Sequence, residues 1–388
     1  MSPEIAPGGA EARVAAPARA WARRSGSGVA HVLMTADTAG AVWPHALTLA
    51  GALARRGVRT SLAVFTEGLA PSMRAEAWTV PGLQIFEGAF RLEWMDDPWD
   101  DLRRAGEWLL SLARVLRPDV VHLNSQVLGG LGWPVPAVVW THGSVCAWWE
   151  AVHGVPAPAA WDRYRAEVRR GLLGAARVVA SSKAMLEDLA RHHGPLPGAR
   201  VVYPARTLTP VRGLEKEPWV LTAGRLADEA SNVEVLEAAA RSVPIRVAGA
   251  GQATGVERPA AGLELVGPLG PEAMRMAMAR AAIYAHPTLY EASGLMPLEA
   301  ALQGCALVLS DIPAVRELWE GAAVFVPPRD AGAWRTALRT LLDETPRRRR
   351  LAEAARARAG TFRPERQAEE LLRVYEGARS EARRASPP

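Results

Sequence analysis

The sequence has little cysteine and no long apolar run, and each absence excludes a class of protein. Its two cysteines, Cys146 and Cys305, lie in apolar stretches without metal-ligand spacing, which excludes a disulfide framework and favours a reducing compartment. No apolar run reaches the roughly 20 residues that a membrane-spanning helix needs. No pair of histidines has ligand spacing beside a carboxylate, so we expect no protein-bound metal. Together these absences predict a cytoplasmic protein.

The composition is that of a globular protein with an excess of positive charge. The chain has 388 residues, enough for two α/β domains with separate cores, and 49% of them are hydrophobic. The net charge is +5, and much of the excess lies in arginines near the ends and at 347–350. Because no basic stripe is interleaved with stacking aromatics, we predict no nucleic-acid binding. An anionic substrate, peripheral contact with the inner face of a membrane, and a solvated arginine-rich surface stay open as explanations.

The two ends of the chain have the composition of disordered tails. Residues 1–28 are rich in alanine, glycine, proline and arginine and end in Ser-Gly-Ser-Gly, which predicts a disordered tail. An Arg-rich, acid-poor organelle transit peptide is the alternative interpretation. Residues 380–388 are also expected to be frayed.

Between the tails, short apolar runs alternate with helical patterns in two successive halves, which predicts doubly wound α/β domains. The first half, at 29–205, is expected to form an N-terminal Rossmann-like domain, and a proline-bearing polar linker follows at 206–218. The second half, at 219–362, is expected to form a similar domain, and a terminal helix at 363–379 to pack back on the first. Two such domains would face each other across a central cleft, where open α/β sheets bind ligands.

The expected elements follow from hydrophobic patterning. Buried parallel strands appear as short apolar runs, whereas helices show apolar residues three and four positions apart. Strands are expected at 29–34, 58–65, 83–86, 120–123, 137–140, 177–180, 201–203, 219–222, 245–248, 263–266, 283–285, 306–310 and 322–326. Helices are expected at 44–56, 99–116, 161–173, 183–191, 233–240, 272–281, 295–303, 331–342 and 364–376.

Two carboxylates eight positions apart form the strongest candidate for a site. Glu291 lies in a predicted loop and Glu299 inside the following helix, with Gly294 and the start of that helix between them. The start of a helix offers unpaired N–H groups and the positive end of the helix dipole, which suit a phosphate. Acids beside it could hold neutral hydroxyls, such as those of a sugar and a ribose. Taken singly, Glu291 fits an ordinary loop acid and Glu299 a solvated helix position better than a functional site, but the pair in this setting indicates a nucleotide-sugar site.

Further candidates lie in loops at the expected carboxyl ends of strands, where open α/β sheets bind ligands. Arg225 follows the first strand of the second half, and its guanidinium suits a phosphate. Gly40, after the first strand, would let the backbone approach a ligand closely, and Asp37 in the same loop could contact a hydroxyl. His142 could bind a sugar hydroxyl or assist proton transfer. A purely structural loop residue is the alternative at each position.

One glycine-rich segment looks like a dinucleotide fingerprint but does not fit it. The segment 249–255 follows a strand, yet its glycine spacing is wrong by one and no amphipathic helix follows. A glycine turn is the better interpretation. We therefore expect no binding of a nicotinamide dinucleotide.

The first half also has a candidate acceptor groove. The chain contains 14 tryptophans, and several in this half could stack on sugars, although core packing explains most of them. The loop at 93–97 holds Glu93, Trp94 and Asp96, which together with Asp37 are the candidates for binding an acceptor.

Taken together, these residues resemble the family 4 retaining glycosyltransferases, which have the two-domain GT-B fold. The most specific element is the E-x7-E motif formed by Glu291 and Glu299. The segment 224–226, the Gly40 loop and the segment 304–313 support it, as does His142. The resemblance covers roughly residues 29–378. It implies transfer with retention, a nucleotide-diphosphate sugar as donor, no obligatory metal or other cofactor, and a glycan, lipid or small molecule as acceptor.

The resemblance also implies roles for individual residues. Glu291 would hold hydroxyls of the donor sugar, Glu299 would bind the donor ribose, and Arg225 would bind the diphosphate and stabilise its departure. Gly40 would approach the diphosphate from the first domain, and His142 would lie near the transferred sugar. The residues implied to cradle the phosphate and sugar through their backbones are Ser293, Gly294 and Leu295. Those implied to border the base are Val266, Gly267 and Leu269.

The sequence departs from the family pattern at several donor-binding positions. Ser231 stands where the family usually has a lysine, Ala41 replaces the usual second glycine, and Ser293 replaces an aromatic residue. The segment 203–206 replaces a common asparagine–glycine turn. Loss of the lysine removes a cation that would stabilise the leaving diphosphate. Two hypotheses follow: an active glycosyltransferase, or a degenerate member that binds a nucleotide or glycan with little turnover. The donor, the acceptor and the oligomeric state stay open.

Overall fold

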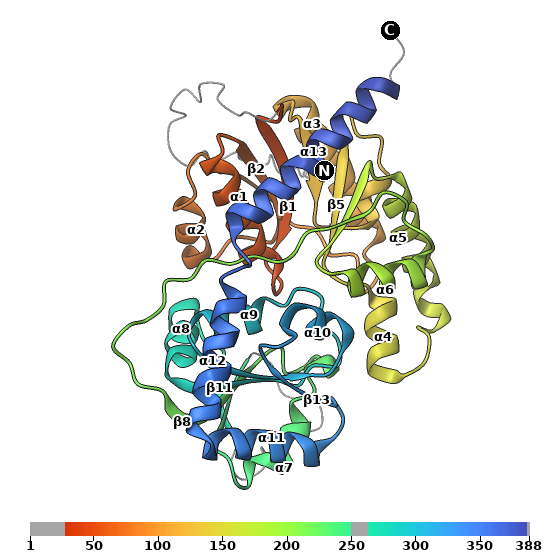
Figure 1. Ribbon diagram of the computed structural model, residues 1–388. Coiled ribbons are helices and arrows are strands. Elements are labelled where there is room, and N and C mark those ends of the chain that lie inside the picture. Colours follow the sequence, from red (N-terminus) through yellow and green to blue (C-terminus); the bar gives the residue numbers. More distant parts are fainter. Residues whose placement is uncertain (1–27, 250–262, 386–388) are drawn as a thin grey trace, which may run out of the picture.

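The computed structural model describes residues 28–249 and 263–385, which form two α/β domains arranged one above the other (Figure 1). The expected tail at 1–28 lies outside the described residues except for its last position, and so do residues 386–388. All but the first residue of the segment 249–255 also lies outside them. Each domain is built on one parallel sheet, which confirms the expected class of two doubly wound domains.

The first domain has a seven-stranded parallel sheet with the order β3-β2-β1-β4-β5-β6-β7. The strand order reverses between β1 and β4, so a ligand crevice opens at the carboxyl ends of these two strands. The strands are β1 (His31–Asp37), β2 (Arg59–Phe65), β3 (Gln84–Gly88), β4 (Val120–Leu123), β5 (Ala137–Thr141), β6 (Arg177–Ala180) and β7 (Arg200–Val201). The helices are α1 (Val42–Arg55), α2 (Pro71–Trp78), α3 (Trp99–Leu116), η1 (Val127–Gly130), α4 (Val145–His153), η2 (Ala159–Trp161), α5 (Asp162–Gly174) and α6 (Lys183–His193).

The second domain has a six-stranded parallel sheet with the order β10-β9-β8-β11-β12-β13, and its order reverses between β8 and β11. The strands are β8 (Glu217–Ala223), β9 (Ile245–Ala248), β10 (Leu263–Gly267), β11 (Ala281–His286), β12 (Ala306–Ser310) and β13 (Val324–Val326). The helices are η3 (Glu229–Ser231), η4 (Val233–Leu236), α7 (Glu237–Ala240), α8 (Pro271–Arg280), α9 (Leu295–Leu302), α10 (Pro313–Trp319), α11 (Ala331–Asp343), α12 (Thr345–Ala359) and α13 (Pro364–Ala385).

Helices cover both faces of each sheet, which explains the continuous apolar runs in the sequence. All seven residues of β1 are buried. Because side chains alternate across a strand, Val32 and Met34 join the core under α1 and α13, while Leu33 joins the core under α3. This burial fixes the position of the loop that follows β1 and enters the site.

The terminal helix α13 leaves the second domain and crosses α1 on the first (Figure 1). Leu371 and Tyr375 are fully buried in the core of the first domain. The expectation of a frayed end from residue 380 is wrong for 380–385, which continue the helix. An ion pair between Arg177 and Glu381 ties these last turns to β6, a contact distant in sequence that composition alone does not reveal.

Some elements differ from the expectation. The helix expected at 233–240 is a 3-10 turn, η4, followed by the four-residue helix α7. The β-branched Val233 and Val235 fit the core but lower the helix propensity of this segment. Hydrophobic patterning did not predict the helices α2, α4, α10 and α12. The helix α12 buries only Ala355 and Ala359, so its apolar stripe is too weak to detect by periodicity.

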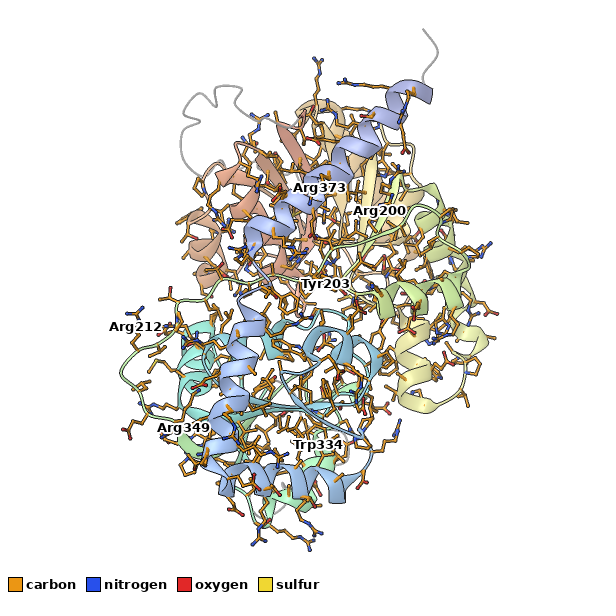
Figure 2. The ribbon with its side chains drawn as sticks, in the orientation of Figure 1. Arg200, Tyr203, Arg212, Trp334, Arg349 and Arg373 are labelled. Atoms are coloured by element: carbon orange, nitrogen blue, oxygen red, sulfur yellow. The ribbon has the colours of Figure 1, made fainter. Side chains whose placement is uncertain are left out.

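Much of the positive charge lies on solvated helices. Arg349 on α12 and Arg373 on α13 are both exposed (Figure 2). In the part of the chain that the structure describes, no helix is both long and apolar enough to cross a bilayer.

Candidate functional site

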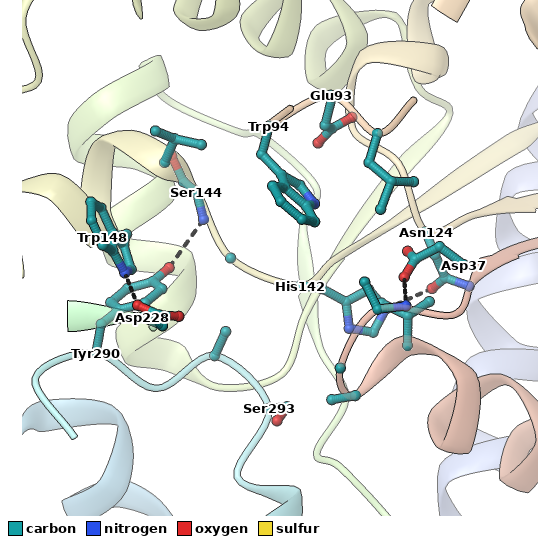
Figure 3. A pocket seen from close by; sticks show the side chains of 18 of the residues that line it. Asp37, Glu93, Trp94, Asn124, His142, Ser144, Trp148, Asp228, Tyr290 and Ser293 are labelled. Atoms are coloured by element: carbon teal, nitrogen blue, oxygen red, sulfur yellow. Dashed lines mark hydrogen bonds between the residues drawn. The ribbon is translucent and has the colours of Figure 1, made fainter. Parts of the chain in front are cut away.

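A cavity of about 690 Å³ lies between the carboxyl ends of the two sheets (Figure 3). Its volume is in the range typical of small-molecule sites. The first domain contributes the loops after β1, β4 and β5 and the segment around Glu93, whereas the second contributes the segments 225–231 and 288–293. The loops come from the strands that flank both reversals in strand order, so the fold itself explains the position of the cavity.

Glu291 lies in the cavity wall and is held within its own loop. Its Oε2 accepts a hydrogen bond from Nε2 of His286 at 2.6 Å. Its Oε1 accepts from the backbone N–H groups of Ser293 at 2.7 Å and Gly294 at 2.8 Å. Burial alone would raise the pKa of Glu291, but the hydrogen bond and charge of His286, together with the backbone donors, lower it from 4.5 to about 2. Glu291 is therefore ionised at neutral pH.

Gly294 shapes the turn that presents Glu291. Its φ of 65° lies in the left-handed region, and an added Cβ would come within 2.6 Å of Leu318 Cδ1, so glycine is strongly favoured here. The same turn leads into α9. Because Glu291 already engages the N–H groups of Ser293 and Gly294, and Ser293 Oγ accepts from the N–H of Leu295 at 3.4 Å, these three groups are satisfied within the protein.

Glu299 has different surroundings and does not line the cavity. Its Oε1 accepts from Nε of Arg206 at 2.8 Å, and both side chains are mostly buried. The same guanidinium donates to the carbonyl of Pro44 at 3.3 Å and to Oγ1 of Thr48 at 3.0 Å, both on α1. Burial raises the pKa of Glu299, and Arg206 offsets only part of this rise. The segment 203–206 differs from the family pattern, and its Arg206 thus joins Glu299 to the first domain.

The loop after β8 places Arg225 in the cavity wall. Its side chain is 61% exposed, donates to Asp228 at 3.1 Å and lies 6.0 Å from the ring of Trp94 across the cavity. Ser231 also lines the cavity, and its Oγ donates to the carbonyl of Arg225 at 2.6 Å, so it braces the loop without adding charge. Neither of the two lysines in the sequence, Lys183 and Lys216, belongs to the cavity wall.

The loop after β1 brings Asp37 and Gly40 to the cavity. Asp37 is 8% exposed, and its Oδ1 accepts from the N–H of Ala39 at 2.8 Å. Burial raises the pKa of Asp37 to about 6, although the Ala39 hydrogen bond opposes the rise. Gly40 has a φ of 66° and leads into α1, whose first turn has no side-chain cap. The open N–H groups of this first turn are suited to an anion.

His142 lines the cavity beside Asn124, a residue that the sequence analysis missed. Nε2 of His142 lies 2.7 Å from Oδ1 of Asn124, whose backbone N–H donates to Oγ1 of Thr35 at 2.8 Å. Burial, reinforced by His122, lowers the pKa of His142 to about 3. The ring is therefore neutral at neutral pH and is suited to hydrogen bonding rather than to proton transfer. Asn124 directly follows β4, so the strand-end rule that selected His142 also selects it.

The acceptor candidates in the loop 93–97 separate into two groups. Glu93 and Trp94 line the cavity, whereas Asp96 does not, and its carbonyl accepts a hydrogen bond from Arg91 at 2.7 Å. Glu93 is buried and accepts from Oγ of Ser125 at 2.6 Å and from the backbone N–H of Val127 at 3.1 Å. Burial raises the pKa of Glu93 despite these hydrogen bonds.

The residues expected to border the base lie outside the cavity wall. Val266 and Leu269 pack against the core of the second domain, and Gly267 ends β10 with a φ of 71°. The structure thus brings together all the expected positions except these three, Gly294, Leu295, Glu299 and Asp96.

Two direct contacts between the domains lie side by side in the cavity wall, and the sequence did not predict them (Figure 3). The hydroxyl of Tyr290 accepts from the N–H of Ser144 at 3.1 Å (Figure 3). Nε1 of Trp148 donates to Asp228 at 3.0 Å, so the partner of Arg225 also joins the two domains. Each contact pairs residues far apart in the sequence, which local patterning does not reveal.

Comparison with known proteins identifies the family. Residues 42–206 match the family described as Glycosyltransferase Family 4, and residues 217–344 match Glycosyl transferases group 1. The chain belongs to the family 4, group 1 glycosyltransferases. Membership implies a nucleotide-sugar donor, as the E-x7-E motif had suggested, and it also implies a sugar acceptor. The two family matches agree with the architecture, because one lies in the first domain and the other in the second.

Individual relatives of this family 4 protein are distant in sequence. It is 26% identical to the D-inositol 3-phosphate glycosyltransferase of Nocardia farcinica, over 88% of this chain and 85% of the relative. The sucrose-phosphate synthase of Thermosynechococcus elongatus matches with a TM-score of 0.75 and 17% identity, over 92% of this chain and 100% of that one. WaaG, a glycosyltransferase involved in lipopolysaccharide biosynthesis, matches with a TM-score of 0.66 and 16% identity, over 89% and 100%. These structures confirm the GT-B fold.

Proposed function

We propose that this family 4 protein is a retaining transferase that moves a sugar from a nucleotide-diphosphate sugar to a hydroxyl of an acceptor in the cavity. The bond from the anomeric carbon to the diphosphate oxygen breaks, and a bond from the same carbon to the acceptor oxygen forms on the same face. The acceptor proton leaves with the nucleoside diphosphate. The proposal rests on one observation: an ionised acid, Glu291, and an arginine, Arg225, line the same cavity. Arg225 is the single arginine or lysine among the described cavity residues.

Glu291 has the capacity to bind the donor sugar. Its Oε1 is engaged by backbone donors, but among the described residues only His286 donates a hydrogen bond to Oε2. A carboxylate oxygen can accept two hydrogen bonds, so Oε2 has room for a sugar hydroxyl. His142 offers a second contact, because its ring stays neutral and the described part of the chain engages it by a hydrogen bond at Nε2 alone.

The leaving diphosphate would lie between the two domains. Arg225 is exposed, and its one ion pair among the described residues is with Asp228, so it can turn toward a phosphate without breaking a buried contact. The loop of Gly40 and the uncapped start of α1 face it from the first domain. These groups would stabilise the negative charge that develops as the diphosphate leaves.

The donor ribose would lie beside Glu299. Arg206 engages Oε1, and no described residue donates to Oε2 of Glu299, which leaves this oxygen for ribose hydroxyls. Arg206 would keep the carboxylate ionised and oriented during binding. On this proposal the base lies toward 266–269, beyond the cavity wall described above.

The test is transfer from labelled UDP-, GDP- and ADP-sugars to a panel of acceptors, with Arg225→Ala as the comparison. We expect transfer or slow donor hydrolysis with one donor class, and a loss of about 100-fold or more in Arg225→Ala. Donor turnover that is undetectable in the native protein, or unchanged in the variant, would contradict the proposal. An inositol phosphate, which stands in the name of the Nocardia relative, belongs in the panel.

The absence of a lysine at Ser231 favours a second candidate function, binding of a nucleotide or glycan with little turnover. Ser231 braces Arg225 through its Oγ but contributes no charge to a leaving diphosphate. Ser231→Lys distinguishes the candidates. A weakened catalyst gains turnover at unchanged donor affinity, whereas a binding module binds the nucleotide in both forms and turns over in neither.

A further inference from the structure

The cavity wall contributed by the first domain carries negative charge and no cation. Asp37 and Glu93 belong to it, and none of the described lining residues of this domain is an arginine or lysine. The second domain adds Arg225, but it also adds Asp228 and Glu229. The donor diphosphate would engage Arg225, so no described cation of the wall is left for a second anion.

Of Asp37 and Glu93, Asp37 is the acid with a carboxylate oxygen to which no described residue donates a hydrogen bond. The side chain is more than nine-tenths buried, its Oδ1 accepts from Ala39, and no described residue donates to its Oδ2. Glu93 differs, because its two oxygens accept from Ser125, Gln126 and Val127. Glu93 therefore adds negative charge to the wall, while Asp37 is available to bind a ligand donor (Figure 3).

Aromatic side chains complete this wall. Trp94, at 43% exposure, lines the cavity together with Trp161 and Tyr164. Aromatic faces pack on the C–H faces of sugar rings and attract cations, but they offer nothing to a phosphate. The wall thus combines one unsatisfied acceptor of hydrogen bonds, a second negative charge and apolar faces.

We propose that the acceptor is a polyol without an anionic group, such as a free sugar, a cyclitol or an amino sugar, and that Asp37 binds one of its hydroxyl or ammonium donors. This inference rests on the proposed function and names the acceptor class for the same cavity. A phosphate or carboxylate on the acceptor would face Asp37 and Glu93 without a counter-charge from the first domain. A hydroxyl or ammonium donor satisfies the open Oδ2 of Asp37 instead.

The test compares matched acceptors that differ by one phosphate, with the donor found in the transfer screen. Suitable pairs are myo-inositol with inositol 3-phosphate and glucose with glucose 6-phosphate, and glucosamine adds an ammonium group. We expect kcat/KM for each phosphorylated member to be at least about tenfold below that of its partner. Equal or better use of the phosphorylated members would overturn the inference.

Asp37→Asn tests the residue, with Asp100→Asn as the matched control because Asp100 is 95% exposed on α3. We expect Asp37→Asn to lower kcat/KM for the unphosphorylated acceptors by about tenfold. The ratio of kcat/KM between each unphosphorylated acceptor and its phosphorylated partner should therefore fall. The control should change neither value. A variant that keeps the native preference would overturn the role of Asp37.

Donor binding separates failure of this inference from failure of the proposed function. If the native protein binds and hydrolyses the donor but prefers phosphorylated acceptors, only the acceptor class is wrong. If it neither binds nor hydrolyses any donor, the proposed function fails and this inference fails with it.

Discussion

The two acids of the E-x7-E motif are close in sequence but lie in different parts of the structure. Glu291 lines the cavity and is held by His286 and by the backbone of its own loop. Glu299 lies outside the cavity wall and is held by Arg206, a residue of the segment that joins the two domains. One carboxylate is therefore fixed locally, whereas the other depends on how the domains are arranged.

This difference shows what a shared motif does and does not specify. The spacing places one acid before α9 and one inside it, whatever surrounds them. The partner of each acid comes from elsewhere in the chain. Because Arg206 also contacts Pro44 and Thr48 on α1, any movement between the domains would alter the surroundings of Glu299 more than those of Glu291.

The largest expected effect is the loss of turnover in Glu291→Gln. Replacing the ionised acid removes the charge that pairs with His286 and the proposed acceptor of a sugar hydroxyl. We expect kcat to fall by about 100-fold or more, with Kd for the free nucleoside diphosphate nearly unchanged. Steady-state kinetics of transfer or donor hydrolysis measure the change. Glu320→Gln, at a side chain that is 66% exposed, is the control.

The next effect concerns Glu299→Gln, which should weaken donor binding rather than slow chemistry. A lost hydrogen bond to a charged group corresponds to about a tenfold rise in the Kd of the nucleoside diphosphate. Titration calorimetry measures it. If Kd stays at the native value, Glu299 serves only to link the domains and the ribose lies elsewhere.

A smaller effect is expected from the contact between Arg206 and Glu299. Each single change, Arg206→Ala or Glu299→Gln, leaves a mostly buried partner without its counter-charge, whereas the double variant removes both. We expect a coupling free energy of about 1–2 kcal/mol in a double-mutant cycle of unfolding. If the changes in unfolding free energy of the two single variants add up to that of the double variant, the contact between Arg206 and Glu299 does not stabilise the fold.

The smallest effect is the pH dependence of stability that Glu291 contributes. Its pKa in the folded protein is about 2, below its ordinary 4.5, so its ionised form stabilises the fold fully above pH 4.5. That stability is lost as the pH falls from 4.5 toward 2. Between pH 7 and pH 4, we expect the native protein to lose about 1 kcal/mol more of unfolding free energy than Glu291→Gln. Denaturant unfolding at both pH values measures the difference, and parallel losses in the two proteins would contradict the lowered pKa.

Much of the fold and part of the site could be predicted from the sequence. Apolar runs predicted the parallel sheets because strands such as β1 are buried along their whole length. The strand-end rule selected Asp37, His142 and Arg225, which all line the cavity, and it would also have selected Asn124. These successes share one cause: the carboxyl ends of parallel strands meet at one edge of a sheet.

The remaining features depend on contacts between distant segments. Arg206 reaches Glu299, and Trp148 reaches Asp228, across the boundary between the domains. No local pattern encodes such pairs. Asp96 belongs to the same short loop as Glu93, yet it lies outside the cavity wall because the loop directs neighbouring side chains differently.

The most direct test of the account compares the Kd of a nucleotide sugar with that of its nucleoside diphosphate, in the native protein and in Glu291→Gln. If Glu291 holds the donor sugar, the native protein binds the nucleotide sugar more tightly than the nucleoside diphosphate, and the variant loses that extra affinity. Equal extra affinity in both proteins, or no binding of any nucleotide to the native protein, would contradict the account.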